Sequence, residues 1–599
     1  MTVAGPARSR RRLAVLLLVL IASTAAGTGH AGAQTVPPAA QYRGFWVDTF
    51  NTRFATPDDV AAIVARATLA RANLIVVQVR RRGDAWYLDG REPLAESVTF
   101  PTDFDPLREL IARGHGAGLA VHAAVTIGAI WNQAVPPQHP DHVFNRHGFD
   151  AAGPIPGRQN WLTRTRPGDT TSPAALGGYR FGLDFWIDPG HPEAAAYTVG
   201  VVADLVERYP LDGLHLDALR YPEVPPSATG EWSPSVGYNE VSLERFRRLA
   251  GLPADAVPAA SDEVWGAWRR EQVTALLRRL TLAALAARPA IVVSAGLAAN
   301  GEAPAAAGGT DDDAWRATES YGRVFQDWYH WSEAQLVDVL VPLAYRAEHV
   351  TAAAEAFGSW VQWTRAHAAG RHVAIAIGAY LNSIEGSLRQ VRRATAAPTA
   401  ANADPLAAPV ADGVLFFALG AHNAPVSSNP LAVSGPRDTP YRSFEDLAAG
   451  LLTGRTTAGQ PLESTSLPPL FARPAALPLP AWKATPITGH LRGTLVSTAT
   501  GQPIDGAAVV LEPEAIVERT GIGGVVDPQA ASVALDRTDG GGTFGAIGIG
   551  PGRYRVIVTP PRDGRYRSTC AVTITAGSVA TVALELDPSR PATATCQAP

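Results

Sequence analysis

Cysteine is nearly absent from this sequence of 599 residues, and the two that occur, Cys570 and Cys596, both lie near the C-terminus. No cluster of cysteine and histidine has the spacing of a zinc site, and no Gly-x-Ser-x-Gly motif marks a serine nucleophile. The sequence therefore predicts no metal, no cofactor and no esterase-type site. Export would allow a disulfide between the two cysteines.

Charge is also sparse, at 18% of residues with a formal net charge of -4 and no long run of either sign. This composition argues against nucleic acid and anionic membranes as partners. It says nothing about oligomeric state.

One apolar run stands out, Leu13 to Ala22, and its length of about ten residues is half of what a bilayer requires. Arg8 and Arg10 to Arg12 precede it, and Ala31-Gly32-Ala33 offers a small-residue cleavage site. We expect residues 1–33 to be a signal peptide and the protein to be secreted or periplasmic, with an uncleaved anchor as the alternative. No membrane-spanning segment is expected beyond the signal.

Apolar runs and amphipathic stretches alternate from residue 40 to residue 453, which predicts a (β/α)8 TIM barrel. The eight expected strands are Arg43–Asp48, Leu74–Arg80, Ala120–Thr126, Gly213–Asp217, Ala290–Ala295, Val337–Tyr345, Val373–Tyr380 and Gly413–Leu419. Thr56-Pro57-Asp58-Asp59 and Asp105-Pro106 predict helix starts, and Gly118 a helix end. Two long connections, Asn132 to Pro189 and Asn300 to Asp313, are expected to rim the barrel mouth.

The composition changes after the barrel. Residues 454–485 are rich in proline, threonine and alanine and are predicted to form a linker. Short β segments with turns between residues 486 and 588 predict a small all-β sandwich, followed by a tail at 589–599. Thr538-Asp539-Gly540 with Pro551 to Val556 resembles the carboxypeptidase regulatory-like modules, which implies an accessory rather than a catalytic role.

The segment Asp212 to Pro222 gives the clearest functional signal. Leu214 and Leu216 alternate with His215 and Asp217, so a strand here directs the leucines to the helices and the polar pair inward. Acids at the ends of barrel strands are typically catalytic.

Four stretches together resemble the glycosyl-hydrolase-like 10 family: Arg43 to Asp48, Leu183 to Glu193, Asp212 to Pro222, and Val324 to Trp328 with Val341 to Tyr345. The resemblance implies a TIM barrel that hydrolyses glycosidic bonds of extracellular or cell-wall polysaccharide, including peptidoglycan glycan strands in some relatives. Many relatives carry an acid or a bulky residue directly after the strand-four aspartate. This chain has Ala218 there, which argues against a mechanism with two adjacent acids.

Glycoside hydrolysis uses two carboxyl groups, about 5 to 5.5 Å apart for retention and about 6.5 to 9.5 Å apart for inversion. Asp217 is the first candidate. Spacing selects no single partner, and the catalytic candidates beside it are Asp48, Asp188, Glu223 and Glu319, with Asp84 and Glu302 also near strand ends or loops.

The same alternation gives candidate substrate contacts at several strand ends. They are Gln78, Arg80, His122, Arg220, Tyr221, Tyr345 and Tyr380. A sugar ring could stack on any of four tryptophans in predicted loops, which are Trp86, Trp131, Trp186 and Trp315. Trp131 is the one that we predict to contact the substrate. Each of these residues could equally serve local structure.

The sequence leaves two other functions open. One is a carbohydrate-binding barrel that has lost a catalytic carboxylate, which Ala218 favours. The other is an exported deacetylase or esterase, for which the sequence offers neither a spaced metal triad nor a nucleophile elbow.

Overall fold

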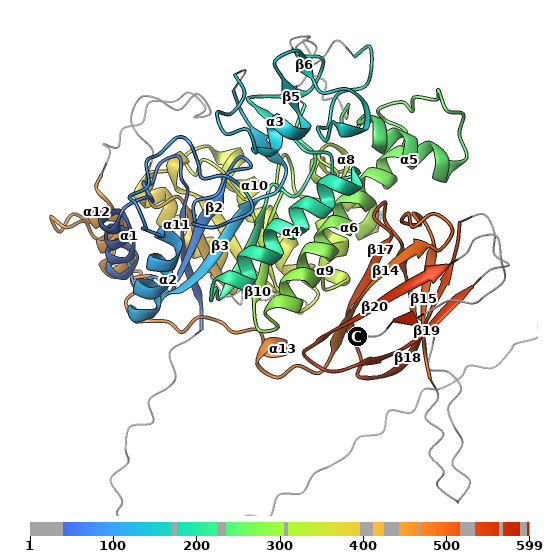
Figure 1. Cartoon of the computed structure of the whole chain (residues 1–599). Helices are drawn as coiled ribbons and strands as arrows, with labels where there is room; N and C mark the ends of the chain where they lie inside the picture. The colour runs from blue at the N-terminus through green and yellow to red at the C-terminus, as the bar shows by residue number, and fades with distance from the viewer. Residues whose placement is uncertain are drawn as a thin grey trace, which may run out of the picture. The chain divides into compact units, whose positions relative to one another are not determined.

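The computed structural model describes residues 40–133, 135–169, 176–224, 235–304, 310–395, 411–423, 442–464, 466–514, 533–561, 567–586 and 596–597 (Figure 1). The predicted signal peptide and most of the predicted C-terminal tail lie outside these residues, so both stay predictions.

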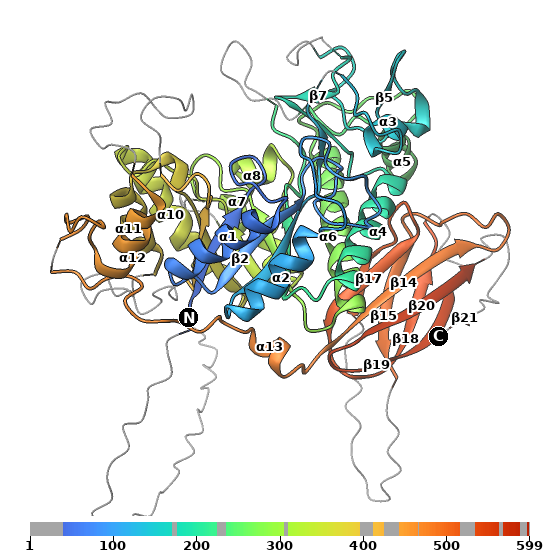
Figure 2. The ribbon, with the colours of Figure 1, turned by 60° about the vertical axis from the view of Figure 1, so that its left-hand side comes forward.

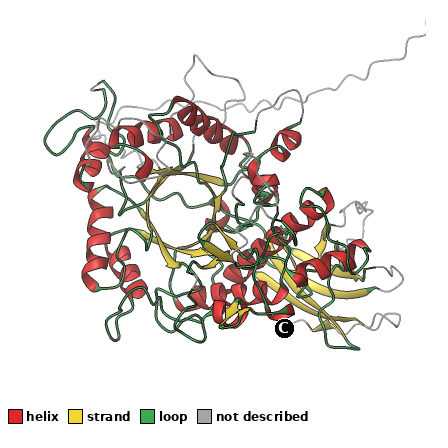
Figure 3. Cartoon of the chain, turned by 90° about the horizontal axis from the view of Figure 1, so that it is seen from above, coloured by secondary structure: helices red, strands yellow, loops and turns green. Residues whose placement is uncertain are grey.

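Eight parallel strands close into a barrel, in the order β1-β13-β12-β11-β10-β9-β3-β2. Seen from above, the strands form a ring surrounded by helices (Figure 3). Their bounds are β1 (Tyr42–Val47), β2 (Leu74–Arg80), β3 (Ala120–Thr126), β9 (Gly213–Asp217), β10 (Val292–Leu297), β11 (Val339–Pro342), β12 (His372–Gly378) and β13 (Gly413–Phe417). The predicted TIM barrel is confirmed, with each expected strand within a few residues of its place.

The two faces of strand β9 follow the predicted alternation. Leu214 and Leu216 are buried in the large core between the strands and the helices. His215 points into the barrel, where its ring meets the indole of Trp46 with centroids 4.6 Å apart. Asp217, two residues on, therefore faces the inside of the barrel at the end of its strand.

The helices begin where their capping residues predict. Thr56 and Asp59 form a capping box at the start of α1 (Pro57–Leu69), and Asp105 caps α2 (Pro106–Gly116). The other helices around the barrel are α4 (Pro192–Arg208), α5 (Glu240–Ala250), α6 (Glu263–Ala287), α7 (Asp311–Arg316), α8 (Glu319–Gly322), α9 (Trp328–Glu333), α10 (Thr351–Ala366), α11 (Ile384–Thr395) and α12 (Phe444–Thr453). Within the described residues, no helix has the length and apolar character needed to cross a bilayer.

The long connection between β3 and β9 builds a small layer of its own above the barrel. It contains β4 (Ala129–Trp131), α3 (Val143–His147), β5 (Phe149–Asp150), β6 (Gly153–Pro154), a 3-10 turn (Gly157–Gln159), β7 (Arg180–Phe181) and β8 (Asp184–Trp186). Strands β4, β8 and β7 form an antiparallel sheet in that order. This sheet brings residues 184–186 back over the end of β3.

The C-terminal region is a sandwich of two four-stranded sheets, β17-β14-β20-β21 and β16-β15-β18-β19, around one apolar core. The strands are β14 (Gly489–Ser497), β15 (Ala508–Pro513), β16 (Val533–Arg537), β17 (Thr543–Ile549), β18 (Gly552–Thr559), β19 (Ser568–Ile574), β20 (Val579–Leu586) and β21 (Cys596–Gln597). Cys570 in β19 is disulfide-bonded. Figures 1 and 2 show β14 and β17 beside helix α6.

The predicted linker, residues 454–485, is held against the barrel along part of its length. Arg43 Nη1 donates to the carbonyl of Arg473, and Gln41 N donates to the carbonyl of Ala476. Phe471 is fully buried beneath the Arg43 guanidinium, 4.3 Å from its ring centroid. Backbone carbonyls of this segment thus accept hydrogen bonds from a side chain and a backbone N–H at the start of the barrel, before α13 (Ala481–Ala484) leads to the sandwich.

Candidate active site

A cavity of about 230 Å³ opens at the carboxyl-terminal ends of the barrel strands. The residues around it come from the ends of six barrel strands and from the long β3–β9 connection. They are Phe50, Gln78, Arg81, Arg82, Thr126, Ala129, Asp184, Trp186, Asp217, Ala218, Arg220, Gly296, Ala298 and Leu343. TIM-barrel enzymes build their active sites at this face.

The polar floor of the cavity is fixed by a chain of hydrogen bonds. The backbone N–H and hydroxyl of Thr49 donate to Gln78 Oε1 at 3.2 and 2.9 Å, and Gln78 Nε2 donates to Thr126 Oγ1 at 3.2 Å. Thr126 lies beside Asp217 in the pairing of β3 with β9. The side chain of Gln78 is therefore oriented before any ligand binds.

Asp217 lies between these groups and Gly296 of β10. A methyl group at residue 296 would be 3.2 Å from Asp217 Oδ1, so glycine leaves the space that the carboxyl group occupies. Burial raises the pKa of Asp217 above its ordinary value, although a backbone hydrogen bond at Ala218 and the charge of Arg220 oppose that shift. A carboxyl group with a raised pKa is suited to donate a proton.

Ala218 adopts a left-handed backbone conformation, with φ of 51°. This conformation is unfavourable for alanine and turns the chain sharply at the end of β9. The turn places Arg220 at the cavity, where its guanidinium lies 5.2 Å from the ring of Trp186.

Aromatic rings and arginines make the walls of the cavity. Phe50 is 55% exposed and has the guanidinium groups of Arg81 and Arg82 at 4.7 and 4.8 Å from its ring. Arg81 also donates to the carbonyl of Thr49 and to Ser97 Oγ, while its Nε lacks a partner among the described residues. Three arginines thus line the cavity against two carboxylates, Asp184 and Asp217.

Asp184 is the second carboxylate at this cavity, and the sequence did not single it out. It begins β8 and forms an ion pair with Arg82 at 3.2 Å. The backbone of this strand is anchored to the barrel because Ile187 N donates to the carbonyl of Gly128. Asp184 and Trp186 share one face of β8, which is the face at the cavity.

The sequence profile of the glycosyl hydrolase-like 10 family matches residues 41–393, well over half of the chain. The chain belongs to the glycosyl hydrolase-like 10 family.

Curated relatives of this family member are distant. The glycosyl hydrolase YngK of Bacillus subtilis is 23% identical over 47% of this chain and 48% of its own length. The glycosyl hydrolase DigH of Escherichia coli is 22% identical over 46% of this chain and 54% of its own length. The chain thus spans about half the length of these relatives. Among solved structures, the glycoside hydrolase domain of PgaB from Bordetella bronchiseptica aligns at a TM-score of 0.42 and 14% identity, over 63% of this chain and 94% of that domain.

Gln326 stabilises the backbone around the cavity. It belongs to one of the four stretches that carry the family resemblance. Gln326 is fully buried and donates to the carbonyls of Leu219 and Gly296, both at 3.1 Å. Its side-chain oxygen accepts from Ala298 N at 2.6 Å. One amide group therefore ties the turn after β9 to the end of β10.

Asp48, Tyr345 and Tyr380 lie at the barrel mouth but do not line the cavity. Asp48 is 1% exposed and accepts a hydrogen bond from Asn51, and its Oδ1 lacks a partner among the described residues. Burial raises its pKa. Burial likewise raises the pKa of Tyr345, and the charges of Asp217 and Asp48 add to that shift. The rings of Tyr345 and Tyr380 meet edge to face at 6.1 Å.

The structure places Asp188 and Tyr221 in a buried network instead of at the cavity. Asp188 Oδ1 accepts from Gly190 N at 2.8 Å, Ser242 Oγ at 2.9 Å and Tyr221 Oη at 3.1 Å. Both residues are fully buried. Burial raises the pKa of Asp188 to about 6 in spite of these three hydrogen bonds. The network supports two residues that line the cavity, because Trp186 lies two residues before Asp188 and Arg220 directly precedes Tyr221.

Arg80 also lies outside the cavity, for an identifiable reason. The pairing of β2 with β3 shifts register between Gln78 and Arg80, and such a bulge redirects the side chain after it. Arg80 instead binds both oxygens of Glu92, at 2.7 and 2.8 Å, in a buried ion pair. Gln78 therefore faces the cavity as the alternation predicts, the prediction for Arg80 is wrong, and Arg81 lines the cavity in its place.

The remaining predicted residues occupy other environments. His122 is buried inside the barrel against Gly213, and burial lowers its pKa to about 4, so it is neutral. Trp131 is buried and donates to the carbonyl of Val135. Glu319 is paired with Arg323 at 2.8 Å. Glu223 stays near the rim, where it accepts from Asn300 Nδ2 at 2.6 Å and lies 3.5 Å from Arg220.

Proposed function

We propose that this protein is an exported glycoside hydrolase that cleaves extracellular or cell-wall polysaccharide. The observation that carries this proposal is the pair of carboxylates, Asp217 and Asp184, at one cavity on the catalytic face of the barrel. Family membership supports the same reaction class. The charged residues before Leu13 support export.

In the proposed mechanism, Asp217 is the general acid. Burial raises the pKa of Asp217, which favours the protonated carboxyl group that a general acid needs in order to protonate the glycosidic oxygen in the transition state. Asp184, with the counter-charge of Arg82 at 3.2 Å, is the second carboxylate that attacks the sugar or activates water. Phe50 and Trp186 provide apolar surfaces against which a pyranose ring can stack.

The charges at the cavity favour a glycan that carries carboxylates. Arg81, Arg82 and Arg220 outnumber the two acids there, and guanidinium groups bind carboxylates through paired hydrogen bonds. Peptidoglycan glycan strands from which the stem peptides have been removed fit this description, because the lactyl group of each muramic acid then carries a free carboxylate.

The alternative is a barrel that binds glycan without cleaving it. The ion pair of Asp184 with Arg82 favours this reading, since a carboxylate held by an arginine can serve structure alone.

The test compares the wild type with Asp217→Asn, Asp184→Asn and Asp48→Asn on peptidoglycan glycan strands and on a panel of neutral and acidic polysaccharides. New reducing ends are measured, and binding is measured in parallel by co-sedimentation. Loss of release in the first two variants, with release kept in Asp48→Asn, supports the assignment. Loss in Asp48→Asn with release kept in Asp184→Asn would transfer the second role to Asp48. Binding by every protein without release supports the alternative.

A further inference from the structure

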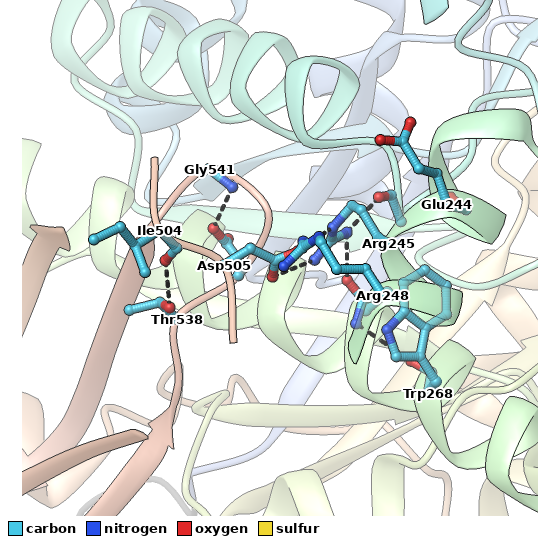
Figure 4. Close-up of polar contacts among 12 residues, drawn as sticks. Glu244, Arg245, Arg248, Trp268, Ile504, Asp505, Thr538 and Gly541 are labelled. Carbon is cyan, nitrogen blue, oxygen red and sulfur yellow. Dashed lines mark hydrogen bonds and ion pairs between the residues drawn. The ribbon is translucent and has the colours of Figure 1, made fainter. Parts of the chain in front are cut away.

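One of the contacts between the β-sandwich and the barrel is made by the turn that carries Asp505. Two glycines allow this close approach: a methyl group at Gly506, where φ is 80°, would be 2.4 Å from Leu249 of α5, and one at Gly540 would be 2.5 Å from Arg245 Nε. Thr538 fixes the turn, because its hydroxyl donates to the carbonyl of Ile504 at 2.6 Å (Figure 4). The Thr538-Asp539-Gly540 motif therefore lies at the contact between the two domains.

Asp505 is fully engaged by arginines of α5. Arg245 Nε and Nη2 donate to its two oxygens at 2.9 and 3.0 Å, and Arg248 is ion-paired with the same carboxylate (Figure 4). The side chains of Asp505 and Arg245 are only 7% and 8% exposed. Removing one partner of such a buried, two-pronged pair leaves the other charge without compensation.

Arg245 also reaches the loop that leads away from the cavity. Its remaining nitrogen, Nη1, donates to the carbonyl of Gly190 and to Gln272 Oε1 at 2.8 Å. The guanidinium lies 5.4 Å from the ring of Trp268. One guanidinium thus joins a carboxylate of the sandwich to the backbone of the β8–α4 turn.

That turn continues into the cavity wall. Gly190 N donates to Asp188 Oδ1 at 2.8 Å, and Tyr221 Oη donates to the same oxygen at 3.1 Å. Trp186 lies two residues before Asp188, and Arg220 directly precedes Tyr221. Both Trp186 and Arg220 line the cavity.

We propose that Asp505 is a positioning residue, through which the C-terminal β-sandwich sets the position of the cavity wall at residues 184–190. The contact with Arg245 holds the guanidinium so that Nη1 stays on the Gly190 carbonyl. The sandwich is then part of the architecture of the barrel site, and no contact of its own with substrate is needed.

The experiment measures backbone hydrogen exchange across residues 184–191 in the full chain, for the wild type and for Asp505→Ala, Asp505→Asn and Arg279→Gln. Arg279→Gln is the matched control, because Arg279 also joins the domains, through Asp539 at 3.0 Å, without any bond to the β8–α4 turn. We expect Asp505→Ala to raise exchange in this segment about tenfold, or about 1.4 kcal/mol of opening free energy, with the barrel strands unchanged. Asp505→Asn keeps an oxygen acceptor and gives a smaller rise.

Wild-type exchange at residues 184–191 in Asp505→Ala, or an equal rise in Arg279→Gln, overturns the proposal. Loss of protection throughout the barrel in Asp505→Asn also overturns it, because Asp505 would then act on folding as a whole. A second readout rests on the proposed function: with a glycan that the wild type cleaves, Asp505→Asn should raise KM more than it lowers kcat. The exchange result stands by itself if no glycan is cleaved, so failure of the proposed function and failure of this proposal are distinguishable.

Discussion

Replacing Gly128 with alanine offers a direct test of whether Trp186 forms part of the active site. Gly128 follows β3 beneath the indole of Trp186, and a methyl group there would be 2.3 Å from Trp186 Cε3 and 2.6 Å from Cζ3. Ordinary contact begins at 3.4 Å, so the indole must move by about 1 Å. The third neighbour, the backbone carbonyl of Ala218, would lie 3.0 Å from the methyl group, which is also closer than ordinary contact.

A displacement of this size at a substrate-binding surface costs on the order of 100-fold in kcat/KM, while overpacking lowers stability by about 1 to 3 kcal/mol. The assay is initial-rate release of reducing ends, with thermal unfolding measured on the same samples. Gly358→Ala in α10 is the control, since a methyl group there meets nothing within 4 Å. A folded Gly128→Ala protein with wild-type kcat/KM would show that Trp186 does not contact the substrate.

Three further predictions follow from the same geometry. Asp188→Asn should remove a pH dependence of stability. Burial raises the pKa of Asp188 from 3.8 to about 6, so the protonated carboxyl group contributes to the free energy of unfolding below pH 4, and this contribution is lost as the pH rises through 6. The difference in unfolding free energy between variant and wild type should change by about 2.4 kcal/mol between pH 4 and pH 7 in urea titrations, and a constant difference contradicts the assignment. Phe50→Ala should raise KM about fivefold with stability within about 0.5 kcal/mol, and an unchanged KM excludes Phe50 as a surface on which a sugar stacks. Leu183→Ala, at a 67% exposed residue that directly precedes Asp184 in the sequence, is the control and should change neither KM nor stability. Arg81→Gln should lower kcat/KM about tenfold on acidic glycans and less on neutral ones. Equal losses on both would show that the charge of Arg81 does not select acidic glycans.

The barrel and the position of Asp217 are predictable from the sequence because both depend on local alternation. Leu214 and Leu216 against His215 and Asp217 give the two faces of β9 directly, and the structure agrees. Gln78 obeys the same rule on β2. Arg80 does not, because a bulge that depends on pairing with β3 redirects it.

Asp184 was not predictable in the same way, because β8 exists only through its pairing with β4 and β7. The chain around it lacks a long apolar run, and within the stretch that resembles the family Asp188, four residues later, is the more conspicuous acid. The alternation of Asp184 with Trp186 was the available signal. Likewise, nothing local distinguishes Asp505, whose partner Arg245 is 260 residues away.

The decisive measurement is reducing-end release by Asp217→Asn on a glycan that the wild type cleaves, because it shows whether Asp217 is the general acid. The substitution keeps the shape of the side chain and removes the proton that the proposed mechanism transfers. We expect a loss of about 10²- to 10⁴-fold in kcat with glycan binding and thermal unfolding unchanged. Release by Asp217→Asn at the wild-type rate would contradict this expectation.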